Sequence, residues 1–329
     1  MRAIVYSATG GTDVIGLSDD VAEPVVGSDD ALVEVAFAGL NRADILERRG
    51  MYAVPAGAVP TPGMEYSGIV RAVGERVTTI EPGDRVCGLV VSGAHAVRLA
   101  ANAGTLSKLP SGVSLRDAAA IPEAFMTAHD ALFGRAAFAL GESVVVHAVG
   151  SSVGLAATGL ARAAGGVAIG TSRSPGKLER AKEHGLDYGF VLDDKWVGRV
   201  HAATNGRGAD VILDFVGAPM LEDNLRALAL RGRIVQIGAM GGSAAKIDLA
   251  ALMGKRAALH GTVLRSRPLE EKVALAKLFS RALLPMFERG DLKAEIDAVF
   301  PLDRMAEAHT HMEADKNFGK ILVEIAAET

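Results

Sequence analysis

A run of small residues follows an apolar segment near the middle of the chain, where Glu142 to Leu155 read ESVVVHAVGSSVGL. The valines at 144–146 favour a buried strand, and residues 150–154 favour a tight turn that opens a helix with an apolar face. In a strand, turn and helix of this kind, small side chains let a pyrophosphate approach the backbone N–H groups at the positive end of the helix dipole. The candidate contacts to a dinucleotide are Gly150, Ser151, Ser152, Val153 and Gly154.

This turn departs from the Gly-x-Gly-x-x-Gly pattern, because Val149 and Ser151 stand at the first two glycine positions. Taken alone, it is also compatible with an ordinary buried strand and turn. Ser152 adds a side chain beside the expected pyrophosphate, where it would either donate a hydroxyl contact or crowd the loop. The surrounding elements decide between these interpretations.

The end of the next apolar run, Val167 to Ser172, selects between NAD and NADP. Ser174 with Pro175 predicts a helix start there. An NAD enzyme normally places a carboxylate at this point, but the first one here is Glu179. The candidate ligands of a 2′-phosphate are Ser172, Arg173 and Lys177. Cations at a helix N-terminus oppose its dipole, so we expect NADPH, with a solvated helix start as the alternative.

Strand and helix patterns alternate through this half of the chain and must position these residues. The further strand candidates are 188–192, 209–214, 233–237 and 258–263, and the helical candidates between them are 195–204 and 220–229. Such alternation predicts an α/β domain with a doubly wound parallel sheet.

The remaining chain favours a second, mostly β domain. Its strand candidates are 2–6, 31–37, 67–73, 85–91 and 94–99, separated by Gly and Pro and by a Pro/Gly-rich loop at 55–68. Ser114 with Asp117 and then Pro122 mark helix starts before a helical stretch at 124–138. A long helix is expected at 269–289, and a tail from 294 to 325 ends in a strand. We therefore expect a mostly β domain at 1–121 and 266–329 and a nucleotide-binding domain at 122–265.

Composition excludes several classes of protein. The chain has 329 residues, 49% of them hydrophobic, which gives ample core for two domains. A net charge of -4 gives no general attraction to nucleic acid or to an anionic membrane. Cys87 is the only cysteine, so no intrachain disulfide forms, and no apolar stretch of about 20 residues could span a bilayer. We expect a cytoplasmic protein.

Specific sequence strings carry a family resemblance over essentially the whole chain. They are LNRADILERRGMY at 40–52, PGMEYSGIV at 62–70, AAAIPEAFMTA at 118–128, LRSR at 264–267 and MEADKNFGKI at 312–321. Together they resemble the medium-chain dehydrogenase/reductase superfamily, in particular its zinc-free quinone oxidoreductases and most closely the tumour-suppressor-induced branch. The resemblance implies a Rossmann-type domain that binds NADPH, a GroES-like catalytic domain, and a homodimer paired through the sixth strands.

The residue types at two positions also indicate whether the chain could bind a catalytic zinc ion. Zinc-dependent relatives have Cys and His ligands at the places that correspond to Asn41 and Met64. A thioether in place of an imidazole, with no cysteine nearby, removes two ligands of a site that needs three. We expect chemistry without metal.

The resemblance extends to further site residues. Tyr52 and Asn41 are the catalytic candidates, with Asn41 beside the nicotinamide ribose. A packing tyrosine and a helix cap are the alternative roles. Thr127 is a candidate near the nicotinamide or phosphates, although a helical threonine often only bonds its own backbone. The resemblance also implies cofactor contacts from Gly238, Met240, Leu264, Arg265 and Asn317.

Other polar residues favour structural roles. Asp44 suits the first turn of a helix, His147 suits a hydrogen-bonded core position, and Cys87 suits a buried thiol. The expected function is NADPH-dependent reduction of a small quinone or enone by hydride transfer. An enoyl or alkenal reductase and a non-catalytic NADPH-binding redox sensor remain alternatives.

Overall fold

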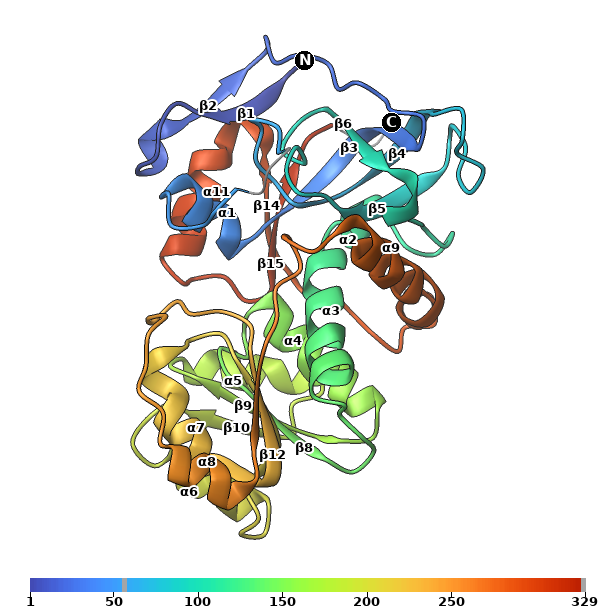
Figure 1. Cartoon of the computed structure of the whole chain (residues 1–329). Helices are drawn as coiled ribbons and strands as arrows, with labels where there is room; N and C mark the ends of the chain where they lie inside the picture. Colours follow the sequence, from blue (N-terminus) through green and yellow to red (C-terminus); the bar gives the residue numbers. More distant parts are fainter. Residues whose placement is uncertain (55–57, 327–329) are drawn as a thin grey trace. The chain divides into compact units, whose positions relative to one another are not determined.

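The structure is a computed structural model that describes residues 1–54 and 58–326. Contacts divide the chain into two compact units (Figure 1). Unit 1 contains residues 1–126 and the chain from 264 onward, and unit 2 contains residues 127–263. The chain therefore builds unit 2 from one continuous segment between the two parts of unit 1.

Unit 2 contains a parallel sheet in the order β10-β9-β8-β11-β12-β13 within the described chain. Its strands are β8 (Ser143–Val146), β9 (Val167–Ser172), β10 (Tyr188–Val191), β11 (Ala209–Asp214), β12 (Leu228–Gln236) and β13 (Ala258–Gly261). The central strands are short apolar runs, as expected for a sheet covered on both faces. The order changes direction between β8 and β11, and such sheets bind ligands at the carboxyl ends of strands at this point. The predicted Rossmann-type sheet is confirmed.

Helices pack on this sheet. They are α4 (Ser152–Ala163), α5 (Pro175–Ala181), α6 (Trp196–Ala203), α7 (Leu221–Ala227) and α8 (Leu249–Lys255). Figure 1 shows α6, α7 and α8 grouped together. Buried side chains of the strands, such as Ile169, Ile212 and Ile234, pack in one cluster with Trp196 of α6 and Leu225 of α7. This apolar layer fixes the strands whose ends carry the predicted nucleotide contacts.

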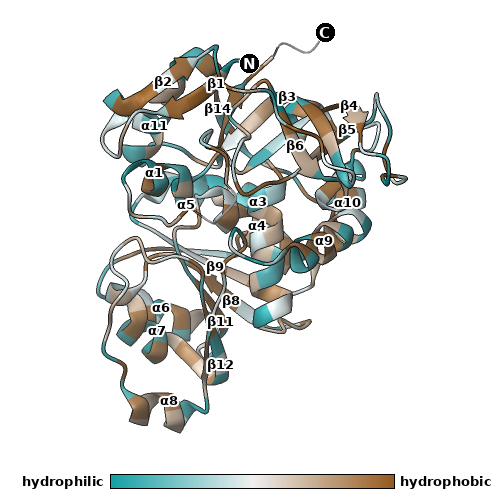
Figure 2. Cartoon of the chain, turned by 45° about the horizontal axis from the view of Figure 1, so that its top comes forward, coloured by the Kyte–Doolittle hydropathy of each residue, from teal (hydrophilic) through white to brown (hydrophobic). Residues whose placement is uncertain are grey.

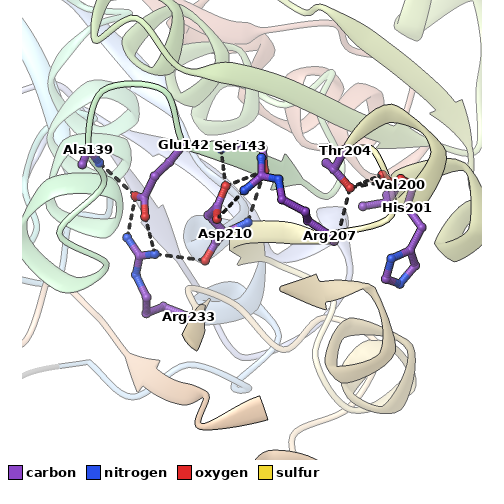
Figure 3. Close-up of polar contacts among 10 residues, drawn as sticks. Ala139, Glu142, Ser143, Val200, His201, Thr204, Arg207, Asp210 and Arg233 are labelled. Carbon is purple, nitrogen blue, oxygen red and sulfur yellow. Dashed lines mark hydrogen bonds and ion pairs between the residues drawn. The ribbon is translucent and has the colours of Figure 1, made fainter. Parts of the chain in front are cut away.

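The amino edge of the same sheet is joined by polar side chains (Figure 3). Asp210 of β11 accepts hydrogen bonds from both the backbone N–H and the hydroxyl of Ser143 in β8, each at 2.8 Å. Arg233 of β12 forms an ion pair with Glu142 at 2.7 Å and donates to the carbonyl oxygen of Asp210. Three neighbouring strands are thus joined at the end opposite the predicted site.

Unit 1 is mostly β. Its strands are β1 (Ala3–Tyr6), β2 (Ile15–Ser18), β3 (Asp30–Leu40), β4 (Glu65–Val73), β5 (Arg85–Leu89), β6 (Arg98–Asn102), β7 (Leu106–Lys108), β14 (Ile296–Pro301) and β15 (Lys320–Glu324). The larger sheet has the order β14-β15-β3-β4-β5-β7 among the described residues, and β6 also pairs with β3. The strands of this sheet pair antiparallel except β14 with β15. The C-terminal strand β15 therefore lies beside β3, which comes from the N-terminal part of the chain.

The helices of unit 1 are α1 (Arg42–Arg48), α2 (Leu115–Ala118), α9 (Leu269–Leu278), α10 (Leu284–Glu288) and α11 (Met305–Glu313), and α3 (Pro122–His129) crosses the boundary between the units. Ile45 of α1 and Met305 of α11 pack in one cluster with Leu40 and Ile321 of the sheet. Within the residues that the structure describes, no helix is both long and apolar enough to cross a membrane.

Several predicted elements have other bounds in the structure. The strand expected at 233–237 begins at Leu228, because the helix expected at 220–229 ends at Ala227. The strand expected at 94–99 begins only at Arg98, because residues 95–97 hydrogen-bond to the start of β1 instead. The long helix expected at 269–289 is interrupted by a π-helical segment at 279–283, just before Pro285, which cannot donate a helical hydrogen bond. The predicted loop at 55–68 ends earlier, since β4 starts at Glu65, and residues 55–57 lie outside the described residues.

Candidate active site

The turn after β8 is tightly packed against the first turn of α4. Ser151 is the N-cap of α4, and its hydroxyl accepts a hydrogen bond from the N–H of Gly154 at 3.1 Å. A Cβ added to Gly154 would lie only 2.7 Å from the carbonyl oxygen of Val149. The first N–H groups of an α-helix have no acceptor inside the helix, so those of Ser152 and Val153 suit an anion. The sequence did not reveal the capping role of Ser151.

The segment after β9 has the predicted helix start. Ser174 is the N-cap of α5, its hydroxyl accepts from the N–H of Lys177 at 3.4 Å, and Pro175 occupies the first turn. Ser172 is buried, and its hydroxyl accepts from the N–H of Ser174 at 3.1 Å. Arg173 is exposed and Lys177 is half-buried. Arg173 therefore lies between the end of β9 and the N-cap of α5, and Lys177 lies in the first turn of α5.

A buried polar chain, the His147 network, crosses the carboxyl edge of the sheet and consists of Thr171, His147, Asn224 and Asp214. Asn224 donates from Nδ2 to Asp214 at 2.8 Å, so its Oδ1 accepts from His147 Nε2 at 2.7 Å. His147 Nδ1 then accepts from the hydroxyl of Thr171, also at 2.7 Å. Burial lowers the pKa of His147, so its ring is neutral at pH 7. The prediction of a hydrogen-bonded core histidine is confirmed.

The other predicted residues of unit 2 lie near this edge or on α3. Gly238 follows β12, and a Cβ there would lie 3.0 Å from the carbonyl oxygen of Phe215, which follows β11. Met240 is half exposed in the same loop. Thr127 is buried on α3. Unit 2 thus brings the predicted residues 150–154, 172–177 and 238–240 to the carboxyl ends of three strands.

In unit 1, Asn41 is the N-cap residue of α1, and its backbone N–H donates to Asp44 at 2.7 Å. The Asn41 side chain has other partners. Its Nδ2 donates to Glu65 Oε1 at 2.9 Å, and its Oδ1 accepts from Lys320 Nζ at 2.8 Å. Glu65 and Lys320 are 0% and 1% exposed. Asp44 has the predicted structural role, whereas the Asn41 amide belongs to a buried charged cluster.

We call this cluster the Asn41 network and define it as Asn41, Glu65, Glu123 and Lys320. Lys320 forms an ion pair with Glu65 and lies 3.8 Å from the Glu123 carboxylate. The second oxygen of Glu65 accepts from the backbone N–H of Glu123 at 3.0 Å. Burial alone would lower the pKa of Lys320, but the carboxylates of Glu65 and Glu123 raise it above its usual value. Lys320 therefore remains charged.

Sequence reasoning assigned no role to Glu65 or Lys320, although both stand in strings that carried the family resemblance. The available signal was a charged residue at the start of an apolar strand, as in Lys320 before ILV and in Glu65 before YSGIV. A buried charge needs a partner, but the sequence does not say which one.

Tyr52 lies beside a buried arginine. The guanidinium carbon of Arg265 is 5.5 Å from the centre of the Tyr52 ring. Arg265 also pairs with Glu47 at 2.5 Å and donates from Nε to the carbonyl oxygen of Val91 at 2.7 Å. Burial raises the pKa of the Tyr52 phenol, and the Arg265 charge opposes that rise. Unit 1 therefore brings these two predicted site residues together.

The last two predicted residues of unit 1 lie in different segments. Leu264 directly precedes Arg265 and is half-buried. Asn317 is half-buried in the loop after α11, where its Nδ2 donates to the carbonyl oxygen of Gly319 at 3.0 Å.

The donor set does not fit a catalytic zinc ion. Asn41 is held by Glu65 and Lys320, and Met64 is a buried thioether. No group of three or more His, Cys, Asp or Glu that could hold a metal ion occurs in the described part of the chain. Cys87 is buried as predicted, and burial raises the pKa of its thiol. These residues offer none of the usual ligand sets for zinc.

Comparison with known proteins assigns the chain to a superfamily. Residues 27–128 match the sequence model of the alcohol dehydrogenase GroES-like domain, and residues 152–280 match that of the zinc-binding dehydrogenases. The chain is 33% identical to the quinone oxidoreductase of Lama guanicoe over 94% of this chain and 92% of that protein.

Solved structures of similar proteins cover the chain almost completely. The quinone oxidoreductase of Escherichia coli complexed with NADPH has a TM-score of 0.87 and 26% identity, covering 98% of this chain and all of that one. An NAD-dependent alcohol dehydrogenase has a TM-score of 0.88 and 29% identity, covering 99% of this chain and all of that one. Quinone oxidoreductases are among the relatives that match this chain over nearly its whole length. Together with the two-unit fold, these matches show that the chain belongs to the medium-chain dehydrogenase/reductase superfamily of oxidoreductases.

Proposed function

We propose that this oxidoreductase transfers hydride from NADPH to a quinone without a metal ion. The choice of NADPH rests on the residues that follow β9. Arg173 and Lys177 lie around the start of α5, and the first carboxylate after the strand is Glu179. Cations at this position suit a 2′-phosphate, whereas a carboxylate would suit the free ribose hydroxyls of NADH. The NADPH complex of the similar Escherichia coli enzyme supports the same choice.

The turn at 150–154 fits the pyrophosphate of such a cofactor. Gly154 leaves no room for a side chain, and Ser151 already caps the helix, so the N–H groups of Ser152 and Val153 are the proposed donors. Gly238 and Met240 lie at the end of β12 in the same unit and are proposed cofactor contacts, as is Thr127 on α3.

In unit 1 we assign Asn41 and Tyr52 to the nicotinamide end, with Leu264, Arg265 and Asn317 as further contacts. When bound, NADPH supplies a hydride, which is two electrons and one proton. A quinone that accepts this hydride needs one further proton to become a hydroquinone. Because burial raises the pKa of Tyr52, its phenol is protonated at neutral pH and can donate a hydrogen bond to the quinone oxygen that gains charge.

A metal ion has no role in this proposal. Asn41 and Met64 replace the ligand types that zinc-dependent relatives need, and the electron-poor quinone requires less activation than an alcohol. The names of the full-length relatives support a quinone as the acceptor.

We also propose that the chain forms a homodimer through β13. This strand is the outermost one of its sheet in the described chain, and Leu259 on it is 44% exposed. Figure 2 shows further hydrophobic residues on the neighbouring α8, where Met253 is 74% exposed. Light scattering during gel filtration should give about twice the 34.1 kDa chain mass, and Leu259→Lys should shift the protein towards the monomer.

The proposed function is tested by following NADPH and NADH oxidation after chelator treatment, with a para-quinone, an ortho-quinone and a simple enal as acceptors. We expect quinone turnover with NADPH that the chelator leaves intact. Preferred turnover of the enal would indicate a double-bond reductase. NADPH binding without turnover of any acceptor would indicate a sensor.

Substitutions at Arg173 and Lys177 test whether these residues select NADPH over NADH. Arg173→Ala with Lys177→Ala should weaken NADPH binding by about tenfold or more and leave NADH binding nearly unchanged, because only NADPH carries the 2′-phosphate. Lys182→Ala is the matched control, since it removes an exposed cation further along the same segment. Equal effects on both cofactors would contradict the assignment.

A further inference from the structure

The amide of Asn41 has a defined orientation. Lys320 can only donate hydrogen bonds and the Glu65 carboxylate can only accept them, so Oδ1 faces Lys320 and Nδ2 faces Glu65. A flipped amide would place a donor against the ammonium group and an acceptor against the carboxylate. The two charged residues thus allow one of the two amide orientations.

In this orientation, the Asn41 side chain can still accept a hydrogen bond, but it has no hydrogen left to donate. Its Nδ2 has two hydrogens, one directed to Glu65 at 2.9 Å and the other near the carbonyl oxygen of Gly39 at 3.4 Å. Its Oδ1 has two lone pairs, and Lys320 uses one. The N–H of Asp44 donates to the backbone carbonyl oxygen of Asn41 at 3.0 Å and makes no cap hydrogen bond to the Asn41 side chain. The remaining lone pair of Oδ1 can accept a hydrogen bond from a ligand. Asn41 therefore acts as the acceptor, and a ligand hydroxyl group acts as the donor.

The sheet provides the space for this arrangement. Gly39 of β3 stands directly opposite Glu65 of β4. A Cβ on Gly39 would lie 2.2 Å from Glu65 Oε1 and 2.5 Å from its carboxyl carbon. The absence of a side chain at 39 therefore lets the carboxylate lie against the strand and reach Asn41.

The other contacts hold the two charged side chains in place. Glu65 uses its second oxygen to accept from the N–H of Glu123, in the first turn of α3. Lys320 is the first residue of β15, which pairs with the end of β3 immediately before Asn41. Both ends of the ion pair are thus fixed by secondary structure.

We propose that Lys320 and Glu65 are positioning residues that fix the Asn41 amide as a hydrogen-bond acceptor for a ribose hydroxyl of the nicotinamide half of the cofactor. The inference rests on the proposed function, which assigns Asn41 to that half. Neither charged residue is proposed to touch the cofactor; both act through Asn41.

A mutant cycle tests this. The dissociation constant for NADPH is measured by fluorescence titration in the unsubstituted chain, in Asn41→Ala, in the double variant Glu65→Gln with Lys320→Met, and in the triple variant. The double variant removes both charges together, so it leaves no unpaired buried ion. We expect Asn41→Ala and the double variant each to weaken binding about tenfold, and the triple variant to bind like Asn41→Ala within about twofold.

Gly39→Ala is a second route to the same result, since it retains both charges but displaces the Glu65 carboxylate. It should raise the KM for NADPH with little change in kcat, and it should have no further effect in the Asn41→Ala background. Multiplicative losses in the triple variant, or unchanged binding in the double variant, would overturn the inference while the proposed function stands. If the unsubstituted chain does not bind NADPH, the proposed function itself fails.

Discussion

Both units bury a polar network beside proposed cofactor residues, but the two networks compensate their charge differently. In the His147 network, Asp214 accepts from the backbone N–H groups of Val216 at 2.6 Å and Gly217 at 2.9 Å, and from Asn224. In the Asn41 network, Glu65 instead pairs with Lys320, which is 255 residues away in the sequence. The negative charge of Asp214 is compensated mainly by N–H groups of the turn that follows it. That of Glu65 is compensated by one distant cation, Lys320, while Asn41 and the N–H of Glu123 add neutral donors.

This difference predicts different tolerance to substitution. Backbone donors next to Asp214 remain present whatever side chains surround them, so removal of one partner costs a hydrogen bond. Removal of Lys320 would leave a fully buried carboxylate without its counter-ion. Four substitutions follow, from the largest expected effect to the smallest. Two change the networks themselves, one changes another buried carboxylate, and one changes a helix cap outside both networks.

Lys320→Met should cause the largest loss of stability. Breaking a buried ion pair by removing one partner costs about 3–5 kcal/mol, because the remaining charge is not compensated. Urea unfolding at pH 7 measures the free energy of unfolding. The double variant with Glu65→Gln should recover a large part of the loss, and a loss below about 1 kcal/mol for Lys320→Met would contradict the contrast.

Asp44→Asn should change the pH dependence of stability. Burial, together with the nearby Glu47 charge, raises the pKa of Asp44 to about 7 although Asn41 donates a backbone hydrogen bond. The second oxygen of Asp44 has no hydrogen-bond partner among the described residues, unlike the carboxylate of Asp214. Because the folded state holds this proton more tightly, its stabilisation is present below pH about 4 and is lost as the pH rises through about 7.

The asparagine variant should remove this loss, so its stability relative to the unsubstituted chain should rise by about 2–3 kcal/mol between pH 5 and pH 7.5. Comparing the two chains at each pH cancels the titration of other groups. These include His95 and His309, two buried histidines whose pKa values burial lowers. Parallel stability curves for the two chains would show that Asp44 has an ordinary pKa.

Asn224→Leu should cost about 2 kcal/mol, less than Lys320→Met, because it removes one neutral hydrogen bond of His147 and one of the donors to Asp214. Urea unfolding gives the value. His147→Leu is the matched comparison, because it removes the same hydrogen bond between His147 and Asn224 from the histidine side. A cost equal to that of Lys320→Met would remove the distinction between the two networks.

Ser151→Ala should have the smallest effect on stability, about 1 kcal/mol, because it removes only the cap of α4. Ser174→Ala, which removes the cap of α5, is the internal control and should cost a similar amount. A much larger loss for Ser151→Ala would indicate that the turn at 150–154 depends on this hydroxyl for its whole shape.

Several helices and strands of unit 2 could be predicted from residues that are close together in the sequence. The strands 167–172 and 209–214 have the predicted bounds, and Ser174 caps its helix as expected. These features depend on side chains within a few positions of each other, such as a β-branched run or a Ser-Pro start. The interruption of the helix after α9 was missed because the hydrophobic pattern continues across Pro285.

The sequence by itself determined the types of chemistry available: small residues at a helix start, cations after a strand, an asparagine and a methionine where zinc ligands would stand. Only the tertiary structure decided the partners of Asn41 and Arg265. Sheet pairing brings Lys320 in β15 next to the end of β3, and Glu65 opposite Gly39. Such contacts follow from the order and register of strands far apart in the chain, which residue types and local spacing do not specify.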